Sequence, residues 1–145
     1  MRAARRAQRR ADERGSVTAE LVILAPLLVL MLLFVVALGR LAGARIDVDG
    51  AAAQAARAAS IARDPGSATA AAEETAASAL AGQGVTCGDL SVSVGTSNFV
   101  PGGSVSVTVA CSVSLADLVG LRLPSTETLS APAVEPVDLY RSLSG

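Results

Sequence analysis

The amino-acid sequence predicts an α+β protein in which a long N-terminal helix precedes a second helix and a small antiparallel sheet. Residues 21–39 form an unbroken apolar run. After Gly84 the spacing of apolar residues changes from about 3.6, which is typical of a helix, to 2, which is typical of a strand. We expect a basic cytoplasmic leader at 1–15, a transmembrane helix at 16–39, a helical stalk outside the cytoplasm at 40–84, and a small β-rich domain at 85–145.

The apolar run has the length of a membrane-spanning helix. Its nineteen residues, LVILAPLLVLMLLFVVALG, carry no charge and rise about 28 Å as a helix, close to the roughly 30 Å of a bilayer core. Pro26 removes one helical hydrogen bond and is expected to bend the helix. The alternative, a buried helix of a soluble core, needs a larger surrounding domain than the remaining Ala-, Ser- and Gly-rich residues offer.

The charges on either side of the run predict its orientation. Six of the twelve Arg residues lie in the first fourteen positions, whereas the residues just after the run include only Arg40 and Arg45, followed by Asp47 and Asp49. Because positive residues favour the cytoplasmic side, we expect a single-pass protein of the cytoplasmic membrane with its C-terminal part exported. The net charge of -1 and the two Phe, one Tyr and no Trp give no indication of nucleic-acid binding.

Two helices are expected between the run and Gly84. Within 40–63 apolar residues recur at helical steps and polar residues take the opposite side. The expected buried face consists of Leu41, Val48, Ala52, Ala55, Ala59 and Ala62. Asp64-Pro65-Gly66 breaks this helix, and 67–80 form a second, Ala-rich helix that ends before Gly82 and Gly84.

Three strands are expected beyond Gly84. Apolar and polar residues alternate over 90–94 and over 104–115, which predicts two half-buried strands with a polar outer face. The intervening Pro101-Gly102-Gly103 favours a turn and therefore an antiparallel hairpin. A third strand is expected at 126–134, where Pro132 places it at an edge of the sheet.

Cys87 and Cys111 are the only cysteines, and we expect them to form a disulfide, since both lie in the part assigned outside the cytoplasm. Cys111 shares the inward phase of the neighbouring valines, whereas Cys87 is one residue out of phase with Leu90, so a bulge at Gly88 is expected. Two buried free thiols are the alternative if the topology is reversed.

The sequence shows no catalytic or metal-binding pattern. It contains no His, which removes the usual general base and the commonest zinc ligand, and two Cys alone make no closed zinc site. The one adjacent acidic pair, Glu73-Glu74, falls on a solvated helix where successive side chains do not face each other. We therefore expect no enzymatic activity, no cofactor, no metal and no small-molecule substrate.

The segment before the apolar run carries the most information about function. It reads Gly15-Ser16-Val17-Thr18-Ala19-Glu20, with a glycine that permits an extended approach to a peptidase and a carboxylate at the start of the apolar helix. Cleavage after Gly15 makes Ser16 the first residue. Its new amine, with a pKa near 8, is then a cation that can pair with Glu20 of the same or a neighbouring chain.

This G-x-x-x-x-E pattern resembles the processing site of type IV prepilins, and the stretch RGSVTAELVILAPLLVLMLLF resembles the TadE-like family. The resemblance implies cleavage by a prepilin peptidase at Gly15, with Glu20 as the family's key acid. It also implies a minor pilin-like subunit of a tight-adherence (Flp) pilus, whose partners are other pilin-like subunits and the assembly machinery. Leu21 stands where the short major pilins usually carry an aromatic residue, which favours the minor component.

Two other interpretations remain open. Ala42-Gly43-Ala44 satisfies the small-x-small rule for signal peptidase, so cleavage after Ala44 would release a secreted domain. Alternatively, the chain is an uncleaved, membrane-tethered binding domain in which Gly15 and Glu20 have no special role. A mature N-terminus at Ser16, Arg45 or Met1 distinguishes the three interpretations.

Overall fold

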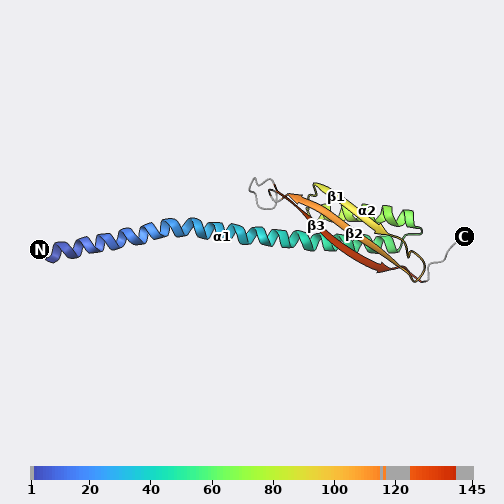
Figure 1. Ribbon diagram of the computed structural model, residues 1–145, viewed down its shortest axis with the longest axis horizontal. Coiled ribbons are helices and arrows are strands. Elements are labelled where there is room, and N and C mark those ends of the chain that lie inside the picture. The colour runs from blue at the N-terminus through green and yellow to red at the C-terminus, as the bar shows by residue number, and fades with distance from the viewer. Residues whose placement is uncertain (1, 115, 117–124, 140–145) are drawn as a thin grey trace. The chain divides into compact units, whose positions relative to one another are not determined.

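The computed structural model describes the backbone of residues 2–114, 116 and 125–139, and side chains from residue 21 onward within those ranges. The chain contains two compact units, Met1–Leu38 and Gly39–Gly145. Two helices and three strands follow one another along the chain (Figure 1), so the predicted α+β class is confirmed. Leu115, which was expected to end the second strand, lies outside the described residues.

Helix α1 (Arg2–Ser60) contains the apolar run and Pro26. The helix begins well before that run, because the leader is rich in Ala, Arg and Gln, which have high helix propensity. Within the described residues, α1 is the one helix long and apolar enough to cross a membrane, and none of its most apolar stretch is buried. The structure therefore gives no support to the alternative of a helix buried in a soluble core of this chain.

The second unit begins with the C-terminal part of α1, which packs on the rest of the unit through its predicted face. Four members of that face are buried, and Leu41 is half-buried and packed against the core. Ala62 also packs against the core but follows the end of the helix, which stops three residues before the expected end at residue 63. The buried members are Val48, Ala52, Ala55 and Ala59. The helix ends at Ser60, whose hydroxyl donates to the Arg57 carbonyl oxygen at 2.9 Å.

Helix α2 (Pro65–Gly82) has well-defined signals at both ends. Asp64 caps its start by accepting the Ser67 backbone N–H at 2.9 Å, and the Ser67 hydroxyl accepts the Asp64 N–H in return, forming a capping box. At its end, Val85 N–H donates to the Leu80 carbonyl and Gly84 N–H to that of Ala81. This is the Schellman arrangement, and Gly84 supplies the positive φ of 73° that it requires.

The three strands form one antiparallel sheet in the order β1 (Asp89–Gly95), β2 (Ser104–Ser114), β3 (Thr126–Pro136). The predicted hairpin between β1 and β2 is confirmed, and Gly102 in its connection has a positive φ of 77°. The third strand is also confirmed, and it forms an edge as Pro132 indicated. Its eleven residues extend two positions beyond the predicted end.

The core of the second unit lies between one face of the sheet and the two helices. The inward side chains of β2 are buried throughout the described strand. They belong to one hydrophobic cluster with the Ala stripes of α1 and α2. The α2 stripe consists of Ala68, Ala72, Ala76 and Leu80, spaced by four residues, so the helix approaches the sheet closely and builds a core almost entirely from Ala and Val.

Candidate processing segment, disulfide and groove

The predicted processing segment lies inside α1. The structure describes the backbone of Gly15, Ser16 and Glu20 as helical and describes none of their side chains. A peptidase that binds its substrate in extended form must therefore unwind the helix here. Gly15, Val17 and Thr18 have lower helix propensity than the Ala- and Arg-rich leader, which would make such unwinding easier. The pairing of the Ser16 amine with Glu20 remains a prediction.

The apolar helix that follows this segment is exposed at every large side chain up to Leu38. The exposed fractions of these side chains run from 45% for Leu33 to 73% for Ile23. A surface of this kind is stable only against an apolar surrounding, either lipid or another apolar helix. Helix α1 is continuous through Pro26. The bend expected at this residue remains a prediction.

The disulfide between Cys87 and Cys111 is present, with Cα atoms 5.3 Å apart. Cys111 is fully buried in the inward row of β2, and Cys87 is half-buried just before β1. The bulge expected at Gly88 is also present, because Gly88 N–H donates to the carbonyl of Ser112 at 2.8 Å although Ser112 is the ladder partner of Asp89. Two consecutive residues thus face one, which brings Cys87 onto the inner side.

The acidic residues of the second unit that the structure describes do not gather into a larger group. Glu73 and Glu74 are exposed on α2, as their sequence position indicated. Within the described residues no three His, Cys, Asp or Glu side chains gather as candidate metal ligands.

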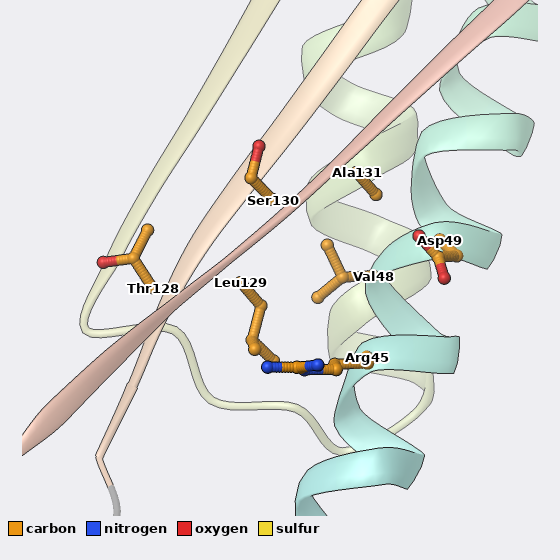
Figure 2. Close-up of a pocket in the computed structure, with 7 residues that line it drawn as sticks. All are labelled: Arg45, Val48, Asp49, Thr128, Leu129, Ser130 and Ala131. Atoms are coloured by element: carbon orange, nitrogen blue, oxygen red, sulfur yellow. The ribbon is translucent and has the colours of Figure 1, made fainter.

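A groove between α1 and β3 is the feature that sequence reasoning missed. It encloses about 360 Å³ and lies between one turn of α1 and the first half of β3. Figure 2 shows Leu129 and Ala131 pointing from the strand toward the helix, with Arg45 and Asp49 at its rim. The helix and the strand are some eighty residues apart in sequence, so no local pattern predicts that they form a groove. The one local signal is the pair of opposite charges Arg45 and Asp49, which lie one helical turn apart.

These features define a class of protein: a small α+β domain preceded by one helix capable of spanning a membrane, with a G-x-x-x-x-E segment at the start of that helix. The family model described as TadE-like protein matches residues 15–57. The match begins at Gly15 and covers Glu20 and the apolar helix, which confirms the resemblance to the TadE-like family that this segment indicated. Comparison with curated proteins and with solved structures finds no significant match.

The matched residues end within α1, before α2 and the sheet begin. The family resemblance therefore rests on the apolar helix and its flanks. The fold of the second unit is established by the structure itself.

Proposed function

We propose that this protein is a minor, pilin-like component of a tight-adherence pilus assembly system, with a structural rather than a catalytic role. The family match carries the proposal, because it coincides with the segment in which processing and membrane insertion would take place. The exposed apolar surface of α1 supports it, since such a helix needs lipid or the helices of other subunits around it.

In this proposal the N-terminus lies in the cytoplasm and the second unit lies outside it. The Arg-rich leader favours this orientation in the cytoplasmic membrane. The disulfide is consistent with it, because disulfides persist outside the cytoplasm and are rare within it. A prepilin peptidase removes the leader after Gly15, and the mature chain then assembles with other pilin-like subunits through its N-terminal helix.

The mature N-terminus tests this proposal against its two alternatives. We would isolate the protein from membranes of cells with an active prepilin peptidase and determine its first residue by mass spectrometry. Ser16 supports the proposal, whereas an intact leader in the membrane fraction supports the tethered binding domain. Arg45 as first residue would support a secreted domain.

One observation speaks against release after Ala44. This residue lies in the middle of α1 and is 6% exposed, packed in the core of the second unit. Signal peptidase needs an extended, accessible substrate, so a cut here requires that α1 unwinds before the domain folds. Cleavage after Ala44 would also remove Leu41, which packs against the same core.

A further inference from the structure

The β3 edge of the sheet is protected against strand addition along only part of its length. Which part is protected depends on which backbone groups point away from β2. Val137 N–H donates to the carbonyl of Gly103 at 2.9 Å, and this pair continues the register of β3 and β2. Antiparallel ladders alternate between bonded and non-bonded pairs. The odd-numbered residues of β3 therefore turn their N–H and C=O groups toward β2, and the even-numbered residues turn theirs away from the sheet.

The prolines of β3 fit this assignment. Pro132 and Pro136 are both even-numbered, so the N–H that each lacks would have pointed away from β2. Prolines at such positions prevent another strand from adding to an edge. The second half of β3 is thus closed to strand addition, whereas the first half, before Pro132, is not.

The open half of this edge borders the groove described above. Thr128 and Ser130 line the groove and are even-numbered, so their backbone N–H and C=O groups point outward beside it. Outside the sheet ladder, the N–H groups of these two residues make no backbone hydrogen bond to another described residue. An extended chain lying in the groove would satisfy these groups by becoming a fourth strand.

The floor and rim of the groove indicate which side chains such a strand would carry. Val48, Leu129 and Ala131 are 1%, 4% and 1% exposed and form an apolar floor. Arg45 and Asp49 are exposed at the rim, and neither takes part in an ion pair within the described residues. Figure 2 shows Arg45 below Leu129 and Asp49 toward Ala131, so the two charges are arranged along the direction of β3.

The spacing of the two charges matches an extended peptide. Four residues of helix rise about 6 Å, and two residues of antiparallel strand rise about 6.8 Å. Residues i and i+2 of a strand also face the same side. An added strand running antiparallel to β3 passes Asp49 first and Arg45 second, so a basic residue followed two positions later by an acidic residue places each charge opposite its counterpart.

We propose that the groove between α1 and the first half of β3 binds an extended segment of a partner protein, which adds antiparallel to β3 and carries a basic-x-acidic pattern facing Asp49 and Arg45. The proposal does not depend on the pilus role, because it follows from the edge, the groove and its charges alone. It identifies the partner by chemistry: an extended segment with small side chains around one basic and one acidic residue.

The test uses full-length protein in detergent micelles and two capped heptapeptides of identical composition, Val-Ser-Arg-Thr-Asp-Ser-Val and Val-Ser-Asp-Thr-Arg-Ser-Val. NMR titration follows the backbone amides, and hydrogen exchange measures their protection. We expect the first peptide to bind at least tenfold more tightly than the second and to slow exchange of the Thr128 and Ser130 amides at least tenfold. Equal binding of the two peptides, or no effect at these amides, overturns the proposal.

Two variants separate the charge from the backbone contribution. The double substitution Arg45→Asp and Asp49→Arg affects exposed side chains only and should reverse the preference between the peptides. Ser130→Pro removes one outward N–H without removing a bond to β2 and should abolish binding while the circular dichroism spectrum is retained. An unchanged peptide preference in the charge-reversed protein contradicts the proposal, as does protection that appears at Val92 of the opposite edge strand.

Discussion

Cys87 is bonded to Cys111, although the ladder partner of Cys111 is Leu90, three residues further along the chain. The offset arises at Gly88, where the bulge lets two residues face Ser112. The bridge therefore links the connection between α2 and β1 to the central strand β2. It does so before Asp89, where the regular pairing of β1 with β2 begins. In a core built mainly of Ala and Val, this covalent link replaces packing that larger side chains would provide.

Loss of the disulfide should destabilise the domain markedly. The bridge joins residues separated by 24 positions, and in the chain-entropy model such a loop contributes about 3 kcal/mol. Cys111→Ser should therefore lower the free energy of unfolding by about 2 to 4 kcal/mol. Urea denaturation of the non-reduced proteins measures this difference.

The control is Cys87→Ser, which removes the same bridge at a half-buried position. It should destabilise the domain less than Cys111→Ser, which also places a hydroxyl in the fully buried row of β2. Two free thiols titrated in the non-reduced wild-type protein would contradict the account of this site.

Two glycines near the end of α2 should respond oppositely to substitution by alanine. Gly84 has a φ of 73°, so Gly84→Ala places a side chain in the left-handed region and should cost about 1 to 2 kcal/mol. Gly82 is helical and a Cβ there meets nothing within 4 Å, so Gly82→Ala should stabilise the protein by about 0.5 to 1 kcal/mol. Thermal unfolding of both variants checks the signs, and equal effects would refute the Schellman assignment.

The cap of α2 should make stability depend on pH in the acid range. Hydrogen bonds from the Ser67 backbone N–H, the Ser67 hydroxyl and the Gly66 N–H hold the pKa of the Asp64 carboxyl below its ordinary value of 3.8. Because the pKa is lower in the folded state, the contribution of the carboxylate is fully present above 3.8 and decreases as the pH falls through the folded-state pKa.

Asp64→Asn tests this dependence, because Asn still accepts the Ser67 N–H but does not titrate. We expect the difference in melting temperature between wild type and variant to shrink as the pH is lowered from 6 to about 3. A difference that stays constant over this range would show that the charge of Asp64 contributes nothing to the cap.

Processing should depend on the absence of a side chain at position 15. We expect Gly15→Val to abolish leader removal, because a β-branched residue obstructs the extended approach that glycine permits. Gly39→Val is the matched control in the same helix, since a Cβ there meets nothing within 4 Å. Immunoblots that resolve precursor from mature protein report the outcome, and normal maturation of the Gly15 variant would exclude cleavage at this site.

Much of the fold follows from local pattern in the sequence. Val alternates with Ser and Thr along β2 because one face packs on Ala-rich helices and the other faces solvent. The sequence therefore predicted both that this segment is a strand and which of its residues are buried. Pro132 gave the edge position of β3 for a similarly local reason, namely the missing N–H. Likewise, the phase of Cys87 relative to Leu90 was sufficient to predict the bulge at Gly88.

Other features depend on tertiary structure and were not predictable. The groove beside β3 needs residues of α1 and β3 that come together only when both pack on the same core. The true length of β3 also exceeded expectation, because the bond between Val137 and Gly103 prolongs the ladder into a segment without alternating pattern. Helix α1 began earlier than the apolar run since helix propensity continues through the leader.

If the chain is the proposed pilin-like subunit, Glu20 is expected to act in assembly between subunits, and Glu20→Ala tests this expectation directly. A carboxylate near the bilayer edge reaches interfacial water, so its removal should leave insertion and leader cleavage intact. If Glu20 pairs with the Ser16 amine of a neighbouring subunit, its loss leaves a buried cation without a partner, which costs about 3 to 5 kcal/mol of assembly. The measurement is piliation, together with co-purification of other pilin-like subunits, in cells where the variant is cleaved and inserted at wild-type levels. The account predicts loss of pili and of these complexes; normal piliation with normal complexes would contradict it.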